Sequence, residues 1–259
     1  MIYGISDLSL IPVREYPSDK SQMVNQLLFG DLFEIKEEQK GWALIKTVDD
    51  NYEGWIDEKQ LKRISKNDFD TILENTNHFV YDHCVSLYDT NNRKITVTKG
   101  ASIPGYQNHQ FSIVDREYSI EGKVETFNKN ATGKTVAATA LQYLGSPYLW
   151  GGRSPFGIDC SGFTQIVFKM NGIKIPRDAS QQVNLGYEID FVEEAKEGDL
   201  AFFGDDESIT HVGIVLDRHK IIHASGEVRI DTFDHQGVFN EERKIYSHHL
   251  RVIKRIMDS

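Results

Sequence analysis

The hydrophobic pattern of the chain changes character near Thr126, and this change limits the folds that its 259 residues can adopt. Before this point, short runs rich in Val, Ile, Leu, Phe, Tyr and Trp recur between turn residues, which is typical of small β-barrels. Beyond it, apolar residues first recur at helical spacing and then form strand-like runs. The sequence therefore predicts an all-β N-terminal half followed by an α+β domain.

A polar segment at 65–77 divides the all-β half into two parts. Strand-like runs precede it at 32–35, 42–45 and 54–56, and a second β-rich part extends from about 77 to 123. The length of the chain fits two or three domains. We therefore expect domains at 1–66, 67–125 and 126–259.

Two helices are expected early in the C-terminal domain. The first is KTVAATALQYL at 134–144, in which apolar residues recur at helical spacing. In the second, Asp159 is the expected N-cap and Gly172 the expected end. Its buried stripe lies at i, i+3, i+4 and i+7, formed by Phe163, Ile166, Val167 and Met170. Strands are then expected at 199–203, 211–216 and 221–224.

Cys160 is the candidate nucleophile because it stands at the start of the second expected helix. Unpaired N–H groups and the helix dipole favour a thiolate over a thiol there. Gly157 and Gly162 would let a substrate backbone come close. The other cysteine, Cys84, fits a strand, and two cysteines are too few for a disulfide scaffold or a zinc site.

A cysteine nucleophile needs a base, and His211 and His223 are the candidates. His211 begins HVGIVLD and His223 ends KIIHAS, and the polar turn between them predicts a β-hairpin. A three-residue loop, or an equivalent bulge, would pair His223 with Gly213 and put both imidazoles on one face. We expect His211 to contact Cys160, and His223 to hold the ring and tautomer of His211.

Metal and cofactor sites are not expected. His211 and His223 lack a third and a fourth ligand, so no metal is predicted. No Gly-rich loop with a Lys is present to hold phosphates. Most of the other histidines occur in polar segments and are interpreted as surface residues: His109, His219, His235, His248 and His249.

Charge and composition restrict the possible partners. The formal net charge of −10 disfavours nucleic acid as a partner. No stretch approaches the roughly 20 apolar residues of a spanning helix, so no membrane partner is expected. The N-terminus lacks the features of a secretory signal. We expect a cytoplasmic monomer, or a periplasmic or exported protein if a leader has been removed.

The C-terminal domain resembles the NlpC/p60 family of bacterial cell-wall cysteine peptidases, a papain-like group. The matching motifs run in order over 131–259: GSPYLWGG, GIDCSGFTQ, IPRDASQQ, EGDLAFF, HVGIVLD and IIHAS. The resemblance implies that Cys160 is the nucleophile, His211 the base and His223 the orienting residue. It also implies an oxyanion site built from backbone N–H groups near Cys160.

The N-terminal half resembles tandem bacterial SH3-like domains through YEGWI at 52–56, and its second domain is degenerate. The three-domain arrangement is similar to the γ-D-glutamyl-L-diamino acid peptidases of cell-wall recycling. That resemblance implies small murein peptides with a free N-terminal L-Ala as substrates. It implies cleavage before L-Lys or diaminopimelate, with release of L-Ala-γ-D-Glu.

The same resemblance implies further substrate contacts in the C-terminal domain. Asp178 matches the family's amine-binding Asp, with an exposed ion pair to Arg177 as the alternative. Tyr148 matches a tyrosine beside the nucleophile. Asp159 and Ser161 flank Cys160 and would meet the substrate backbone.

Three other positions match the family less directly. The familiar Arg-Asp-Ser reads Arg-Asp-Ala at 177–179 here, and Ser180 is the nearest candidate for its serine. Glu53 and Tyr88 are the candidates in the N-terminal half for the amine site and the cleft wall. The alternatives are a solvated carboxylate for Glu53, and a core or surface position for Tyr88.

Two other functions remain open. The same catalytic domain could serve a wall endopeptidase, an amidase or an acyltransferase. The SH3-like domains could instead belong to a wall-binding module without catalysis. Retention of Cys160, His211 and His223 argues against the second alternative, and acetylation of the substrate amine separates the first from the recycling enzyme.

Overall fold

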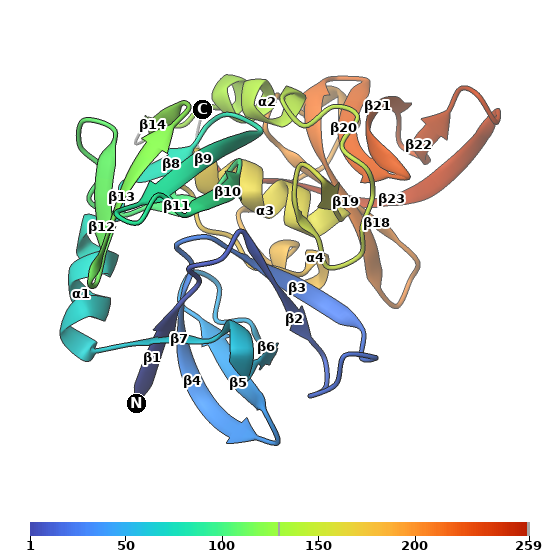
Figure 1. Cartoon of the computed structure of the whole chain (residues 1–259). Helices are drawn as coiled ribbons and strands as arrows, with labels where there is room; N and C mark the ends of the chain where they lie inside the picture. Colours follow the sequence, from blue (N-terminus) through green and yellow to red (C-terminus); the bar gives the residue numbers. More distant parts are fainter. Residues whose placement is uncertain (129, 258–259) are drawn as a thin grey trace. The chain divides into compact units, whose positions relative to one another are not determined.

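The structure is a computed structural model that describes residues 1–128 and 130–257. The chain forms two compact units, one of Met1–Phe127 with Trp150–Pro155 and one of Asn128–Leu149 with Phe156–Ser259 (Figure 1). Each unit is described by itself. The second unit begins at Asn128, and the expected domains at 1–66, 67–125 and 126–259 stay predictions.

The segment Trp150–Pro155 belongs to the first unit, although the sequence analysis assigned it to the C-terminal domain. The buried guanidinium of Arg153 lies 2.9 Å from Asp31 and donates to the backbone oxygen of Gln26 at 2.8 Å. The backbone N–H of Arg153 also donates to the side chain of Gln26. A buried charge requires such partners, and they explain why this segment packs with strands far away in the sequence.

The first unit begins with a seven-stranded antiparallel sheet in the order β3-β2-β6-β5-β4-β1-β7. Alternate side chains of β2 and β5 are buried, and Ile11, Phe33 and Ile45 are among the residues of the shared core. A 3-10 turn, η1, at Glu58–Gln60 precedes β7. The strands are β1 Ile2–Ile5, β2 Leu10–Arg14, β3 Met23–Leu28, β4 Leu32–Gln39, β5 Trp42–Thr47, β6 Glu53–Asp57 and β7 Lys62–Ile64.

Two smaller sheets complete the first unit, in the orders β10-β9-β13-β12 and β11-β8-β14. Cys84 is the first residue of β9, in agreement with its expected place in a strand. Their strands are β8 His78–Val80, β9 Cys84–Asp89, β10 Lys94–Thr98, β11 Ser102–Ile103, β12 Gln110–Ile113, β13 Arg116–Glu121 and β14 Val124–Thr126, and β15 Arg153–Ser154, from the later segment, lies outside both sheets.

The polar segment that was expected only to separate two parts contains a helix, α1, at Lys66–Asn75. Ser65 caps it by accepting a hydrogen bond from the N–H of Asp68. Phe69 and Ile72 are buried on its one apolar side. The sequence analysis missed this helix because two apolar residues make a weak periodic signal.

The second unit is built on a seven-stranded sheet in the order β17-β23-β18-β19-β20-β21-β22. Because β22 also pairs with β23, six of these strands close on themselves. Phe203, Val215 and Ile253 lie in the core of this sheet. Its strands are β17 Tyr187–Ile189, β18 Leu200–Gly204, β19 Ile209–Asp217, β20 Lys220–Ser225, β21 Glu227–Phe233, β22 Gly237–Asn240 and β23 Ile245–Arg255, and the short β16 Gly157–Ile158 lies outside this sheet.

Three helices of the second unit, α2 Gly133–Leu141, α3 Cys160–Met170 and α4 Ala179–Gln182, pack against β19 (Figure 1). A 3-10 turn, η2, occupies Val192–Glu194. Asp159 is the N-cap of α3, as predicted, and its carboxylate accepts from the N–H of Gly162. Every residue of α3 is buried, so its first residue is held firmly in the unit. No helix among the described residues combines the length and apolar character needed to cross a membrane.

The hairpin of β19 and β20 has the predicted register. His223 pairs with Gly213, and a register shift between Val215 and Asp217 supplies the predicted bulge. A Cβ atom at Gly213 would lie 2.9 Å from the Cβ of His223, which is closer than real side chains allow. Glycine at this position therefore permits the pairing that puts His211 and His223 on one face.

Candidate active site

Cys160 is the first residue of α3 and is 7% exposed. Its sulfur lies against the backbone N–H of Val212, the residue that follows His211 on β19, and against the N–H of Ser161. The packing of α3 on β19 therefore brings the candidate nucleophile beside the candidate base.

Burial raises the pKa of the Cys160 thiol to about 11, and the nearby Asp159 carboxylate adds to the rise. The N–H groups of Val212 and Ser161 and the charge of Arg177 act in the opposite direction. The N–H group of Ser161 at the helix start lowers the pKa of the thiol, in the direction expected from the sequence. Desolvation outweighs the helix, so the resting group is a neutral thiol.

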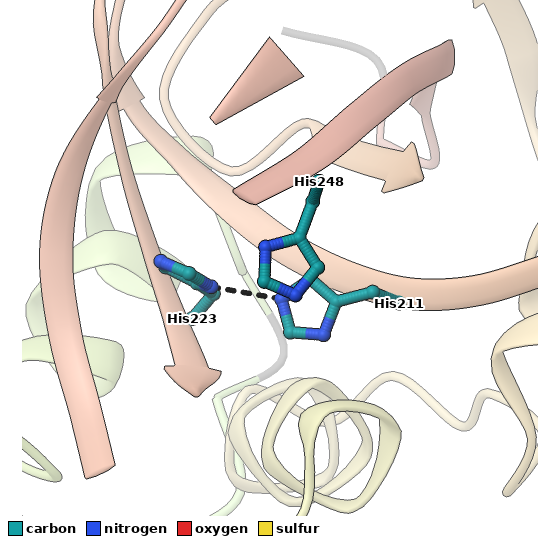
Figure 2. A group of neighbouring side chains, drawn as sticks. All are labelled: His211, His223 and His248. Carbon is teal, nitrogen blue, oxygen red and sulfur yellow. Dashed lines mark hydrogen bonds between the residues drawn. The ribbon is translucent and has the colours of Figure 1, made fainter. Parts of the chain in front are cut away.

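The two predicted histidines meet in the structure. Nε2 of His211 lies 2.8 Å from Nδ1 of His223, and both rings are buried (Figure 2). Nε2 of His223 lies 3.1 Å from a carboxylate oxygen of Asp231 on β21. Arg229 donates to the other oxygen of Asp231 at 3.0 Å. His211, His223 and Asp231 thus form one hydrogen-bonded series, and Cys160 lies against Val212, the residue after His211.

The hydrogen bonds determine which nitrogen carries each proton. Burial acts to raise the pKa of Asp231, but bonds from His223 and Arg229 outweigh it and lower the pKa, so the group is an ionised acceptor. His223 must then donate from Nε2 and accept at Nδ1. His211 in turn donates from Nε2 and keeps a lone pair on Nδ1, which Figure 2 shows directed away from His223. This nitrogen can take the proton of a thiol.

His211 is neutral in the resting site. Burial lowers its pKa well below the ordinary value of 6.5, and the nearby rings of His223 and His248 lower it further. A neutral imidazole beside a neutral thiol indicates general-base catalysis, in which the proton moves as the sulfur attacks.

His248 lies in the site, which the sequence analysis did not predict. It was interpreted as a surface residue, but its half-buried ring stacks on His211 with centroids 4.1 Å apart and planes at 24° (Figure 2). Burial lowers its pKa to about 4. The available signal was its spacing of two from Leu250, which puts both on one face of β23.

Asp231 is a further residue of the site that was not predicted from the sequence. The register pairs Ile221 with Asp231 and His223 with Arg229, so Asp231 is a diagonal neighbour of His223 on one face. If a turn at Gly226 had been predicted, the separation of eight residues would have placed Asp231 and His223 on the same face of two adjacent strands.

Asp159 and Ser161 have a partner within the protein. The guanidinium of Arg177, which is 1% exposed, donates to the two oxygens of Asp159 at 2.9 and 2.6 Å and to Oγ of Ser161 at 2.9 Å. This excludes an exposed ion pair for Arg177. The buried pair anchors the start of α3, and the contact of Asp159 and Ser161 with a substrate backbone stays a prediction.

Tyr148 lies at the mouth of the site. It lines a cavity of about 240 Å³ together with His211 and His248. Burial raises its pKa to about 12, and the neighbouring Cys160 and Asp159 add to the rise. Its hydroxyl is therefore a permanent hydrogen-bond donor, consistent with the predicted place beside the nucleophile.

Asp178 and Ser180 belong to the start of α4, which packs against β19 and α3. Asp178 is half-buried, and its side chain makes no capping bond to α4. Ser180 is exposed. Their predicted contacts with substrate stay predictions.

Glu53 and Tyr88 belong to the first unit. Glu53 is the exposed first residue of β6, as expected of a solvated carboxylate. Tyr88 on β9 is half-buried, and its hydroxyl donates to Glu121 at 3.1 Å. Their predicted roles at the amine site and the cleft wall also stay predictions.

A thiol at a helix N-terminus, an imidazole base and an imidazole–carboxylate pair behind it define a cysteine peptidase. Residues 145–246 match the model of the NlpC/P60 family, and residues 13–61 match the bacterial dipeptidyl-peptidase Sh3 domain. The chain belongs to the NlpC/P60 family. The fold class and the family resemblance predicted from the sequence are confirmed.

Similar proteins cover most of the chain. A γ-D-glutamyl-L-lysine dipeptidyl-peptidase of Bacillus subtilis is 31% identical over 218 residues, 77% of this chain and 71% of the relative. Dipeptidyl-peptidase 6 of Lysinibacillus sphaericus is 27% identical over 249 residues, 85% and 88% of the two chains. The fold is also that of an NlpC/P60 family protein from Bacillus cereus, with a TM-score of 0.82, 21% identity, and coverage of 99% and 100%.

Replacing Asp231 by Asn should lower kcat by about 100-fold, or about 2.7 kcal/mol of transition-state stabilisation, with little change in KM. An amide lacks the charge of the carboxylate and can present N–H to His223, which would favour the wrong tautomer in both rings. Steady-state kinetics measure this. The matched control is Asp234→Asn, since Asp234 accepts from Tyr246 instead. Equal kinetics for the two variants would contradict the role of Asp231.

The acid limb of kcat/KM should fall below pH 6.5. His211 must be unprotonated to act, and burial lowers its pKa, so the active form survives to a lower pH than an exposed histidine would allow. Because the pKa of the Cys160 thiol is about 11, its ionisation should cause no loss of kcat/KM at mildly alkaline pH. An acid limb at or above 6.5 would show that the imidazole is charged in the resting enzyme.

Proposed function

We propose that the enzyme hydrolyses the γ-D-glutamyl-L-diamino acid bond of murein peptides that carry a free N-terminal L-Ala, releasing L-Ala-γ-D-Glu. The observation that carries the proposal is the hydrogen-bonded series His211, His223 and Asp231 beside Cys160 within a cysteine peptidase fold. Relatives named γ-D-glutamyl-L-lysine dipeptidyl-peptidase and dipeptidyl-peptidase 6 support both the bond and the size of the released fragment.

The first half-reaction forms a thioester. The sulfur of Cys160 attacks the γ-carbonyl carbon of D-Glu while its proton moves to Nδ1 of His211. Backbone N–H groups at the start of α3 would stabilise the oxyanion. The C–N bond then breaks, and His211 returns the proton to the leaving amine of the diamino acid.

The second half-reaction regenerates the thiol. Water replaces the leaving amine and loses a proton to His211 as it attacks the thioester carbon. The C–S bond breaks, and the sulfur recovers the proton from His211. Asp231 and His223 keep the ring of His211 in one tautomer through both half-reactions, so no step waits for the ring to reorient.

Recognition of a free amine would restrict the enzyme to short peptides. A substrate ammonium in a partly buried site needs a carboxylate partner, and Asp178 on α4 is the candidate in the catalytic unit. Tyr148 would donate its hydroxyl to the substrate beside the nucleophile. An acylated amine has no charge to pair with Asp178 and would leave that carboxylate desolvated.

The cytoplasmic location and the monomeric state expected from the sequence are part of this proposal. Cell fractionation and the particle mass in solution check them. The choice between L-Lys and diaminopimelate follows from comparing peptides that differ only at that residue.

L-Ala-γ-D-Glu-L-Lys should be cut between D-Glu and L-Lys, and its N-acetylated form should have a kcat/KM at least about 100-fold lower. The acetyl group removes the positive charge that the amine site is expected to recognise. Mass spectrometry of the products measures both rates, and Cys160→Ala is the control that should cut neither peptide.

Each other outcome has a clear meaning. Equal cleavage of the two peptides would favour an endopeptidase that acts on intact wall. Binding without cleavage would favour a wall-binding module. Cleavage by Cys160→Ala would overturn the mechanism.

A further inference from the structure

Three imidazoles converge at the active site, although the proton path uses only two of them. One ligand nitrogen from each of His211, His223 and His248 lies within 4.8 Å of the other two (Figure 2). They come from β19, β20 and β23, so the sheet holds all three rings in place. The sequence analysis rejected a metal site because a third ligand was lacking, and His248 supplies it.

The spacing of these rings is close to that of a zinc site. Zinc binds histidine nitrogens at about 2.0–2.1 Å in a tetrahedron, which puts ligand nitrogens about 3.4 Å apart. Nε2 of His211 and Nδ1 of His223 are already 2.8 Å apart. A bound ion would replace the hydrogen bond between them, so these two rings would part slightly, and rotation of the half-buried His248 would bring in the third nitrogen. The cavity of about 240 Å³ lined by His211 and His248 provides an entry path.

We propose that His211, His223 and His248 form a site for Zn²⁺, and that binding of the ion reversibly switches the peptidase off. Three protein nitrogens would leave a fourth position for water. Imidazole is a good ligand for ions of this type, whereas Mg²⁺ and Ca²⁺ prefer oxygen. The site should therefore discriminate against both of these ions.

The inhibition follows from the tautomers. A metal ion needs the lone pair of Nε2 of His211. In the active form this nitrogen carries the proton that it donates to His223. That proton must move to Nδ1, so the nitrogen that would accept the thiol proton becomes a donor. Nδ1 of His223 likewise gives its lone pair to the metal. The thiol loses its base while the fold is unchanged.

Metal binding does not depend on the proposed function, whereas the inhibition rests on it. The binding experiment therefore uses Cys160→Ala, which removes the thiol as a ligand. Calorimetric titration with Zn²⁺ in a buffer free of thiols should show one site per chain. Adding His248→Phe should weaken binding at least tenfold, because the phenyl ring keeps the stack on His211 but has no lone pair.

The matched control is His249→Phe on the same Cys160→Ala background. His249 is the exposed neighbour of His248 on β23, and its side chain points to the opposite face. This variant should bind Zn²⁺ as the Cys160→Ala protein does. Circular dichroism and the midpoint of thermal unfolding check that every variant is folded, and His248→Gln repeats the test with a polar side chain.

Two results would overturn the binding site. One is the absence of a Zn²⁺ site in the Cys160→Ala protein, and the other is equal binding by the His248→Phe and His249→Phe variants. Titration with Mg²⁺ should show no binding, and equal affinity for Mg²⁺ and Zn²⁺ would point to an oxygen site elsewhere.

The inhibition is tested on the enzyme with Cys160 intact. Zn²⁺ should stop hydrolysis of the tripeptide, and a chelator should restore it. The concentration for half-inhibition, taken relative to each variant's own rate, should rise at least tenfold in His248→Phe and not in His249→Phe. An unchanged concentration in His248→Phe would show that Zn²⁺ acts through Cys160, and the proposed switch would be wrong. Failure of all variants to cut the peptide would contradict the proposed function but not the binding site.

Discussion

The hydrogen bond between Nε2 of His211 and Nδ1 of His223 is the interaction on which the site depends. It forms only because the bulged hairpin puts both rings on one face, where Gly213 leaves room for His223. Asp231 gives the bond its direction, because a carboxylate can only accept. The direction in turn leaves the free lone pair of His211 on Nδ1. One register shift thus determines which atom acts as the base.

Burial decides the charge state of the resting site. The helix N-terminus and two backbone amides favour a thiolate at Cys160, but the loss of solvent is the larger effect. The same loss of solvent keeps His211 neutral. Charge would appear only as the reaction proceeds, where preorganised amides and the His223–Asp231 pair can stabilise it. His248 stacks on His211 and adds the third nitrogen on which the proposed control by a metal ion depends.

Local patterns in the sequence predicted the parts of the site that depend on neighbouring residues. The cap at Asp159, the helix after Cys160 and the hairpin register all follow from spacing within about 15 residues. Asp231 and His248 were missed because their spacing in the sequence places them beside the other histidines only once the strand pairings are known. The burial that raises the thiol pKa could not be predicted, because it arises from the packing of α3 on β19. The helix α1 had too few apolar residues to be recognised.

The tautomers of His211 and His223 test the central claim most directly. Nitrogen-15 NMR of the Cys160→Ala protein at neutral pH reports which nitrogen of each imidazole carries the proton. The account predicts that both rings are neutral and protonated on Nε2, with unprotonated Nδ1. A proton on Nδ1 of His211, or a doubly protonated ring, would contradict it, since the base would then have no lone pair for the thiol proton.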